Sequence, residues 1–298
     1  MIEAVERKIE QYILDLNEKD IFFLVSKIPA GKRLRARLMI EIAGDSLNVI
    51  KCAAIVEMIH AASLLHDDVI DDALKRRGVA SINATFGNKS AIMIGDILYS
   101  KAFYELLDID IFVAKVISNA VVQLSIGERK DVVISESFNS NKDEYITMIY
   151  QKTASLIEAA SESAAIIAKK DRYIYKKYGK NLGIAFQMID DILDIISDEK
   201  TLGKPALNDF REGKTTLPYI YLYEKLSSDE KSKLKQLHKK NLSKDEQDWI
   251  LSKFKEYKII EKAKKEALEL VYEAIELMKK ANEKGLESIA LKMVDRSF

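Results

Sequence analysis

The chain has 298 residues, of which 48% are apolar and 32% charged, a composition typical of a folded globular protein. Lysine plus arginine equals aspartate plus glutamate at 47 each, so the overall charge argues against a nucleic-acid partner. The single cysteine, Cys52, excludes an internal disulfide and a cysteine-based zinc site, and it fits a reducing cytoplasm. Its apolar neighbours predict that it is buried rather than a reactive thiol.

The sequence predicts an all-α fold in a single domain that spans residues 1–298. Apolar residues recur at helical spacing, and no stretch alternates over the length of a strand. The three prolines and most glycines lie at the ends of these periodic runs, as they do in helical proteins. The helices are expected over residues 2–16, 33–44, 47–72, 90–107, 110–135, 143–169, 171–197, 217–226 and 257–282.

Two features of the sequence predict a soluble, cytoplasmic protein. The N-terminus mixes acidic and basic residues, unlike a signal peptide. The 12 uncharged residues between Lys115 and Glu128 fall short of the roughly 20 that span a bilayer. From about residue 224 onward, lysine and acidic residues predict peripheral helices with a solvated face, to which we assign His238.

Two aspartate clusters have the same spacing. Asp67 and Asp71, in "HAASLLHDDVIDDALKRRG", lie four residues apart and therefore on one helix face, with Asp68 beside them. In "FQMIDDILDIISD" the same pattern recurs, in the residues Asp190, Asp191 and Asp194. Carboxylates on apolar helices are costly to desolvate, so something must neutralise them. One patch alone would be a surface acidic cluster, but two identical patches favour magnesium sites.

Basic residues accompany both clusters. Arg76 and Arg77 follow the first, while Lys204, Asp209 and Lys214 follow the second in a loop marked by glycine and proline. Upstream, "GKRLRARL" places several cations at an expected helix start, and "QKTA" adds two polar groups within a long helix; these residues are Lys32, Arg33, Arg35, Arg37, Lys152 and Thr153. Together they offer charge-assisted hydrogen-bond donors suited to diphosphates.

In this order, the motifs resemble those of the trans-prenyl diphosphate synthases over nearly the whole chain. The segments "DDVIDDALKRRG" and "FQMIDDILD" match the two aspartate-rich motifs of that family, and "GKRLRARL" matches its glycine-lysine-arginine motif. One departure is Ala36, where many members have proline, and it affects the rigidity of the helix start more than the chemistry. The resemblance implies the isoprenoid synthase fold, with helices around a central cavity, and a homodimer.

The resemblance also implies a reaction, in which an allylic diphosphate ionises and condenses with isopentenyl diphosphate, and the released diphosphate accepts the proton. Asp67, Asp71 and Asp190 would bind magnesium, three ions per site, with Asp68, Asp191 and Asp194 orienting the surrounding shell. Matches to positions that hold the allylic diphosphate are Arg76, Lys152, Thr153, Gln187, Lys204 and Lys214. Matches to positions that hold isopentenyl diphosphate are Lys32, Arg35, His60 and Arg77. His66 matches no ligand position and is expected to be structural.

Small residues lie below the first cluster, where a growing prenyl chain would extend. Ala62 and Ser63 are five and four residues before Asp67, about 6–7.5 Å down the helix axis. In the family, bulky aromatic residues often occupy this level in enzymes that stop at short products. We therefore expect a long-chain product for quinone side chains, with Ile55, Met58 and Ile59 as deeper walls of the tunnel.

Several alternatives remain open on the sequence. Ala62 and Ser63 could be small for helix packing alone, with another helix closing the tunnel, which would give a short-chain product. A non-catalytic subunit of a heteromeric synthase is a second alternative, although such subunits usually lack one aspartate motif. A class I terpene cyclase is disfavoured because its second metal motif is of an asparagine-serine-glutamate type. Product release could involve transient contact with a membrane.

Overall fold

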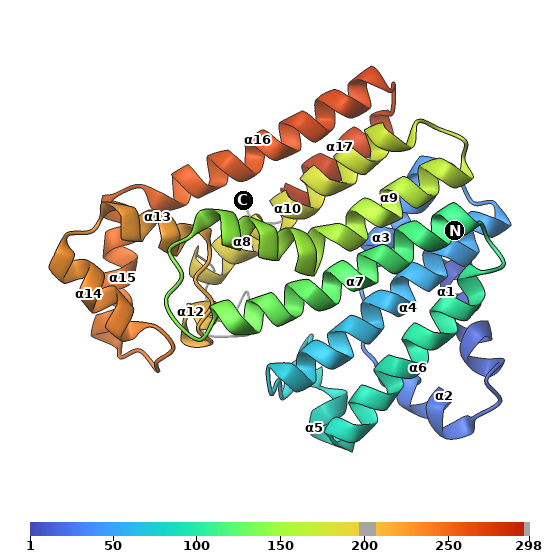
Figure 1. Cartoon of the computed structure of the whole chain (residues 1–298), viewed down its shortest axis with the longest axis horizontal. Coiled ribbons are helices and arrows are strands. Elements are labelled where there is room, and N and C mark those ends of the chain that lie inside the picture. Colours follow the sequence, from blue (N-terminus) through green and yellow to red (C-terminus); the bar gives the residue numbers. More distant parts are fainter. Residues whose placement is uncertain (197–206, 295–298) are drawn as a thin grey trace. The chain divides into compact units, whose positions relative to one another are not determined.

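The computed structural model describes residues 1–196 and 207–294, and Lys204 lies outside them. Helices account for nearly all of the regular structure (Figure 1). In chain order they are α1 (Ile2–Leu14), α2 (Lys19–Ser26), α3 (Leu34–Ala43), α4 (Leu47–Ile70), α5 (Ile82–Phe86), α6 (Asn88–Leu106), α7 (Ile111–Ile134), α8 (Lys142–Ile149), the π-helical turn η1 (Tyr150–Ala154), α9 (Ser155–Ile167), α10 (Arg172–Ile196), α12 (Asn208–Arg211), α13 (Leu217–Lys225), α14 (Ser228–Leu237), α15 (Lys244–Glu256), α16 (Ile259–Lys280) and α17 (Lys284–Val294).

The all-α prediction is confirmed, and the expected helices end within about two residues of the observed ones. The sequence missed the short helices α2, α5 and α12, and also α17. It also missed a small antiparallel hairpin, in which β1 (Lys75–Arg76) pairs with β2 (Val79–Ala80). Strands of two residues are too short to show an alternating pattern.

The chain folds into two compact units. Unit 1 comprises residues 1–124 and 156–179, and unit 2 comprises residues 125–155 and 180–298. The expectation of one domain stays a prediction.

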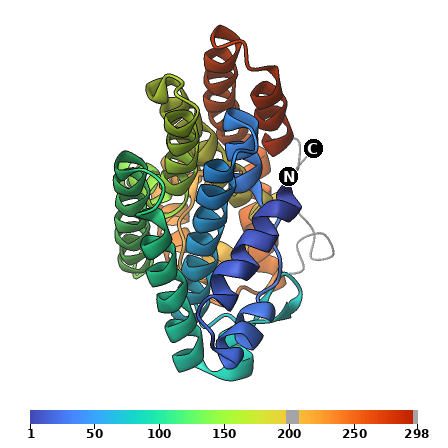
Figure 2. The same cartoon turned by 90° about the vertical axis from the view of Figure 1, so that its right-hand side faces the viewer.

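Helix α4 forms the centre of unit 1. It packs along α6 and also contacts α1 and α3 (Figure 2). Apolar residues surround α4 on most sides, which is typical of a helix buried in a core, and Cys52 is fully buried in it, as predicted. By length and hydropathy alone α4 and α7 could span a membrane, but 67% of the relevant window of α4 is already buried. For α4, this is the behaviour of a core helix.

In unit 2, helices α13, α15 and α16 pack on one another. Ser227 and Glu230 form a capping box at the start of α14, and Ser243 and Glu246 form one at the start of α15. Each box satisfies backbone N–H groups that the first helical turn would otherwise leave unpaired. These reciprocal caps begin helices whose sequences are too polar to show a strong apolar face.

The assignment of His238 to a solvated face is wrong. Its side chain is only 8% exposed and packs edge-on against the ring of Phe210, at 5.5 Å between ring centroids. Nε2 of His238 lies 2.7 Å from the carbonyl oxygen of Gly213, so this nitrogen donates the hydrogen bond. Burial lowers the pKa of His238 and keeps the ring neutral. The polar composition after residue 224 gave no indication that His238 is buried and holds the segment around Gly213 in place.

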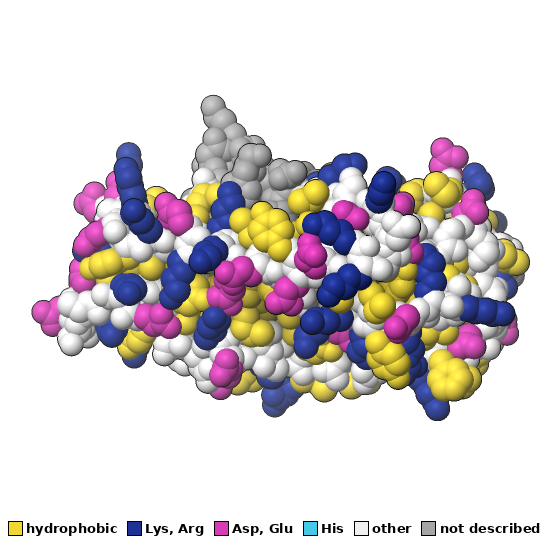
Figure 3. All heavy atoms as spheres, turned by 90° about the horizontal axis from the view of Figure 1, so that it is seen from above, with side chains coloured by type: hydrophobic (Ala, Val, Ile, Leu, Met, Phe, Trp, Pro, Cys, Tyr) yellow, Lys and Arg dark blue, Asp and Glu magenta, His cyan; other side chains and the backbone are white. Residues whose placement is uncertain are grey.

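Charges of both signs are interspersed on the face shown in Figure 3, with apolar side chains between them. No single-sign field covers that face. This pattern agrees with the balanced composition, and it does not resemble the basic stripe of a nucleic-acid-binding surface.

Candidate active site

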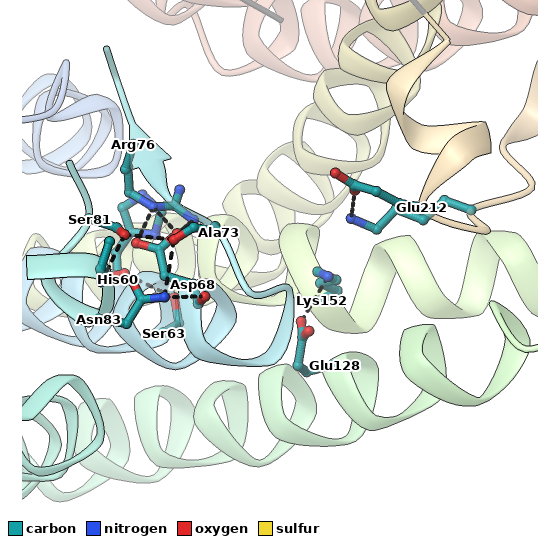
Figure 4. Close-up of polar contacts among 12 residues, drawn as sticks. His60, Ser63, Asp68, Ala73, Arg76, Ser81, Asn83, Glu128, Lys152 and Glu212 are labelled. Carbon is teal, nitrogen blue, oxygen red and sulfur yellow. Dashed lines mark hydrogen bonds and ion pairs between the residues drawn. The ribbon is translucent and has the colours of Figure 1, made fainter. Parts of the chain in front are cut away.

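The first carboxylate patch lies at the C-terminal end of α4. Asp67 is half-buried and Asp71, the C-cap residue, is exposed. Asp68 is only 3% exposed, and its carboxylate accepts hydrogen bonds from Arg76, at 2.8 Å from Nε and 2.6 Å from Nη2 (Figure 4). The patch therefore contains one aspartate that is neutralised within the protein and two that are more accessible.

Asn83 and Ser81 fix the chain just after this patch. The amide nitrogen Nδ2 of Asn83 donates to the carbonyl oxygens of Asp68 and Ala73, at 3.0 and 3.1 Å. The hydroxyl of Ser81 donates to the same Ala73 oxygen at 2.6 Å (Figure 4). These bonds satisfy carbonyl groups at the end of the helix and hold the following hairpin in place.

A cluster of arginines surrounds His60 in the same unit, and its members differ in their partners. Arg33 pairs with Glu6, at 2.6 Å from Nε to Oε1, and with the buried Glu57. Among the described residues, neither Arg35 nor Arg77 has a carboxylate within salt-bridge distance, and Nε of Arg35 is buried with no hydrogen-bond partner. Arg35 thus has a buried donor atom without a partner among the described residues, and the negative charge of Glu57 acts on it without a salt bridge.

The arginine cluster sets the charge state of His60. Burial lowers its pKa well below the usual value, and the positive charges of Arg35 and Arg77 lower it further. The neutral imidazole can still donate one hydrogen bond to an anion. Arg77 lies at the hairpin turn with φ of 52°, and its Nη1 donates to the carbonyl oxygen of Pro29 at 2.7 Å.

His66 has the structural role that the sequence predicted. Its Nε2 lies 3.2 Å from the carbonyl oxygen of Ile92 on α6, and its ring packs near that of Tyr99. A Cβ atom at Gly95 would meet Nε2 at 2.2 Å, so any larger residue there would require the imidazole to move. His66 joins α4 to α6.

The second carboxylate patch lies near the C-terminal end of α10. Asp190 is exposed, whereas Asp191 and Asp194 are 4% and 2% exposed. Asp191 accepts hydrogen bonds from the hydroxyl of Tyr145 at 2.5 Å and from Nε2 of Gln187 at 2.9 Å. Burial, and then the charge of Asp209, raises the pKa of Asp191 to about 8.

Asp194 has a different role from Asp190. Its Oδ2 accepts a hydrogen bond from the backbone N–H of Asp209 at 3.1 Å, and its carbonyl oxygen accepts one from Leu207 at 3.0 Å. Asp194 therefore ties the end of α10 to the start of α12.

A pocket of about 110 Å³ in unit 2 brings several predicted residues together. Its polar walls are made by Asp131, Ser135, Lys152, Thr153, Gln187, Asp191, Asp209, Lys214, Thr215 and Thr216. The ammonium of Lys152 pairs with Glu128 at 2.9 Å (Figure 4). It also pairs with Asp131 at 2.6 Å. The ammonium of Lys214 pairs with Glu212 at 2.8 Å. The pocket therefore offers two cations beside carboxylates and amide or hydroxyl groups.

Lys152 and Thr153 lie on the π-helical turn η1, where the sequence predicted an uninterrupted α-helix. A π turn closes its hydrogen bonds over five residues and holds one residue more than an α turn. Helix propensities do not distinguish the two, because the same residue types suit both. Gly127 on α7 allows close approach here, since a Cβ atom at this position would lie 2.3 Å from the backbone nitrogen of Lys152.

Within the described residues, no group of three or more candidate ligands is close enough to hold a metal ion unaided. Magnesium does not require such a group, because it is usually bound by one or two carboxylates together with waters and substrate phosphates. Asp67, Asp71 and Asp190 are the accessible members of their patches, and their oxygen atoms are hard ligands. Taken separately, each patch offers oxygen ligands of the kind that magnesium takes together with a diphosphate.

Comparison with known proteins decides the family. The family model described as polyprenyl synthetase matches residues 23–254. The chain belongs to the polyprenyl synthetase family. Octaprenyl diphosphate synthase of Haemophilus influenzae is 33% identical over 98% of this chain and 94% of its own length. The crystal structure of octaprenyl pyrophosphate synthase from Helicobacter pylori is 45% identical, with a TM-score of 0.94 over 99% of this chain and 98% of that one.

Other members of the polyprenyl synthetase family have the same fold. A geranylgeranyl pyrophosphate synthetase from Pyrococcus horikoshii is 31% identical, with a TM-score of 0.91 over 99% of this chain and 96% of that one. The family identifies the chain as a prenyltransferase. Its all-α architecture is the isoprenoid synthase fold.

In this polyprenyl synthetase, sequence reasoning missed several polar residues that contact the predicted site. Glu57 accepts a hydrogen bond from the backbone N–H of Ala36 at 3.0 Å and so fixes the start of α3. Glu128 and Asp131, three residues apart on α7, could have been found as an acidic pair on one helix face. Tyr145 belongs to no motif, and no pattern in the sequence indicates that it contacts the site.

Proposed function

We propose that this chain condenses an allylic diphosphate with isopentenyl diphosphate and repeats the step to make a long-chain polyprenyl diphosphate. The supporting observation is that charged residues of the same type differ in their burial and in their hydrogen-bond partners. In both carboxylate patches some aspartates are buried and hydrogen-bonded to protein groups, while others are accessible. Likewise, Arg33 pairs with carboxylates, whereas Arg35 has no carboxylate within salt-bridge distance among the described residues. The accessible acids offer oxygen ligands for a metal ion, and Arg35 offers hydrogen-bond donors for a diphosphate.

We assign the metal ligands to Asp67, Asp71 and Asp190, with three magnesium ions when an allylic diphosphate is bound. Bound magnesium neutralises the diphosphate so that it can leave. Asp68, Asp191 and Asp194 position neighbouring groups rather than the metal itself. Each has a hydrogen-bond partner within the protein.

Two sets of residues bind the two substrates in this proposal. For isopentenyl diphosphate the set is Lys32, Arg35, His60 and Arg77, and for the allylic diphosphate it is Arg76, Lys152, Thr153, Gln187, Lys204 and Lys214. Hydrogen bonds between a cation and a phosphate oxygen are roughly twice as strong as neutral ones. Arg76 already pairs with Asp68, so it would bind a diphosphate while remaining in contact with that aspartate.

The proposal is tested with purified protein, magnesium, farnesyl diphosphate and labelled isopentenyl diphosphate, followed by chromatography of the products. Prenyl diphosphates of about eight isoprene units would support it. Elongation that stops at geranylgeranyl diphosphate would make the chain a short-chain synthase, a candidate favoured by the similarity to the Pyrococcus horikoshii enzyme. A chain that is inactive alone and active with a partner would be a subunit of a heteromeric synthase.

Ala62 and Ser63 are proposed to leave the tunnel open. Ala62 is fully buried, Ser63 is half-buried, and Met58 and Ile59 lie deeper on α4 and are almost completely buried. Replacing Ser63 with phenylalanine should shift the main product to fewer isoprene units, because the ring would block the path of the growing chain. The measurement is the product distribution by chromatography.

Ser63→Val serves as the control for that substitution. It removes the same hydroxyl, which donates to the carbonyl oxygen of His60 at 2.9 Å, but adds no ring. Ala62→Phe tests the neighbouring position, at a cost in stability of about 1–3 kcal/mol from overpacking. If the products of both phenylalanine variants matched those of the wild type, the tunnel would not pass these residues.

We also propose a homodimer, formed through an apolar face of α6 and α7. Large apolar side chains are exposed on these consecutive helices and at the C-cap of α6, namely Ile92, Met93, Leu107, Ile111, Phe112 and Val122. Concentrations of this kind mark interaction sites more often than scattered apolar residues do. Phe112→Asp should convert a dimer into 33.9 kDa protomers in sedimentation velocity, whereas Tyr272→Asp on α16 should not. A wild-type chain that sediments as a monomer would refute the dimer.

We propose a cytoplasmic location and a product that serves quinone side chains. A prenyl chain of this length is strongly apolar, since each buried CH₂ group contributes about 0.8 kcal/mol to membrane partition. Product release would therefore involve transient contact with a membrane. Release of labelled product into added lipid vesicles measures this step.

A further inference from the structure

A directed chain of hydrogen bonds in unit 2 runs from a buried tyrosine to the wall of the pocket. The hydroxyl of Tyr145 donates to Oδ2 of Asp191 at 2.5 Å, and Nε2 of Gln187 donates to Oδ1 of the same carboxylate at 2.9 Å. The hydroxyl of Thr153 then donates to Oε1 of Gln187 at 2.8 Å. Tyr145 is fully buried, while Thr153, Gln187 and Asp191 line the pocket.

The direction of each bond follows from the one before it. The two carboxyl oxygens of Asp191 accept hydrogen bonds, one from the hydroxyl of Tyr145 and one from the NH₂ group of Gln187. Because the NH₂ group of Gln187 faces Asp191, its carbonyl oxygen faces Thr153. The single hydroxyl proton of Thr153 is thereby committed to Gln187. The oxygen lone pairs of Thr153 are left for whatever occupies the pocket.

The π turn makes this chain geometrically possible. Tyr145 and Thr153 are eight residues apart, which in a regular α-helix would place them about 80° apart around the axis. The π turn η1 begins after Tyr145 and includes Thr153, and because a π turn holds more residues than an α turn it reduces this angle. Both side chains therefore reach α10, where Gln187 and Asp191 are one turn apart.

We propose that Tyr145 is a positioning residue that, through Asp191 and Gln187, keeps the oxygen lone pairs of Thr153 turned toward the reacting allylic group. This inference rests on the proposed function, because it concerns the positive charge that develops as the allylic diphosphate ionises. A fixed dipole with its negative end toward that charge stabilises the transition state without reorganising. Tyr145 itself contacts neither substrate.

Loss of the tyrosine hydroxyl has a defined consequence. Asp191 would retain only the donor from Gln187, and its carboxylate could turn to find another. The Gln187 amide could then rotate and present its NH₂ group to Thr153, which would reverse the last bond. The hydroxyl proton of Thr153 would point into the pocket, with the positive end of the dipole toward the cation.

The first test is Tyr145→Phe, compared with Tyr219→Phe as a matched control. Both tyrosines are fully buried in unit 2, but the hydroxyl of Tyr219 has no hydrogen-bond partner among the described residues. Tyr145→Phe should lower kcat about tenfold with KM for isopentenyl diphosphate within twofold of wild type. Tyr219→Phe should leave both constants unchanged. An unchanged kcat in Tyr145→Phe would overturn the inference.

A double-mutant cycle separates positioning from general destabilisation. Thr153→Val removes the oxygen that the chain is proposed to orient, so adding Tyr145→Phe to it should cause less than a twofold further loss of kcat. Fully multiplicative losses would overturn the inference, because Tyr145 would then act independently of Thr153. Thr153→Ser should keep the full effect of Tyr145→Phe, since serine retains the hydroxyl.

Calorimetry with magnesium and inorganic diphosphate supplies a readout without turnover. If Tyr145→Phe binds magnesium and diphosphate with an affinity within twofold of wild type, the result supports an action on Thr153. A tenfold loss of that affinity would mean that Tyr145 acts through metal binding, and it would overturn the inference. Failure of the proposed function is distinguishable, because the wild-type chain would then form no prenyl product at all. In that case the inference falls with it.

Discussion

Asp67→Asn lowers kcat by about a thousandfold or more in our expectation, because an amide is a poor substitute for a carboxylate ligand of magnesium. Loss of metal-assisted charge neutralisation costs several kcal/mol in the transition state, and each 1.36 kcal/mol is a factor of ten. The measurement is kcat for prenyl transfer at saturating magnesium, with the midpoint of thermal unfolding recorded alongside. Stability should change little, since Asp67 is only half-buried.

Asp72→Asn is the matched control for this substitution. Asp72 lies in the same segment and is exposed, but it is not one of the proposed ligands. Its kcat should stay within threefold of wild type. A kcat for Asp67→Asn within tenfold of wild type would remove Asp67 from the metal site.

Arg35→Gln should raise KM for isopentenyl diphosphate about a hundredfold, with a much smaller change in KM for the allylic diphosphate. A hydrogen bond to a charged group contributes about 1.5–3 kcal/mol, and Arg35 could form two with one diphosphate. Nε of Arg35 has no hydrogen-bond partner among the described residues, so this donor is available to a diphosphate. Initial rates with each substrate varied in turn provide the measurement.

Two further arginine variants test that assignment. Arg35→Lys keeps the charge but loses the planar fork, so its KM should lie between those of wild type and Arg35→Gln. Arg7→Gln removes an arginine with a 71% exposed side chain in the same unit and should change neither KM. Equal increases in both KM values for Arg35→Gln would show a collapse of the site rather than loss of one substrate contact.

The long helices were predictable from sequence because their apolar periodicity extends over many turns. Helices α4 and α10 each span more than twenty residues, and their bounds follow from the pattern alone. The β1–β2 hairpin was not predictable, because it depends on Arg77 and Gly78 both taking positive φ at the turn. Positive φ at an arginine is set by its surroundings, here the hydrogen bond to Pro29.

Motif spacing identified the charged residues of the candidate site but could not separate their roles. In "GKRLRARL", Arg33 and Arg35 are equivalent by composition, yet only Arg33 finds Glu6 and Glu57, residues distant in sequence. The same holds for Asp190 and Asp191, because the hydroxyl that donates to the buried Asp191 belongs to Tyr145, on another helix. Such distinctions arise from packing between elements, which one sequence does not encode locally.

The π turn at Tyr150–Ala154 also bears on how this region could change during evolution. Because the turn accommodates one extra residue, deleting one residue there would restore a regular α-helix and leave the segments before and after the turn at nearly the same relative rotation. Tyr145 would then keep its orientation relative to the residues after the turn, and the change would fall on Lys152 and Thr153 within it. A homologue one residue shorter here would therefore keep the tyrosine side of the hydrogen-bond chain and differ in the residues that line the pocket.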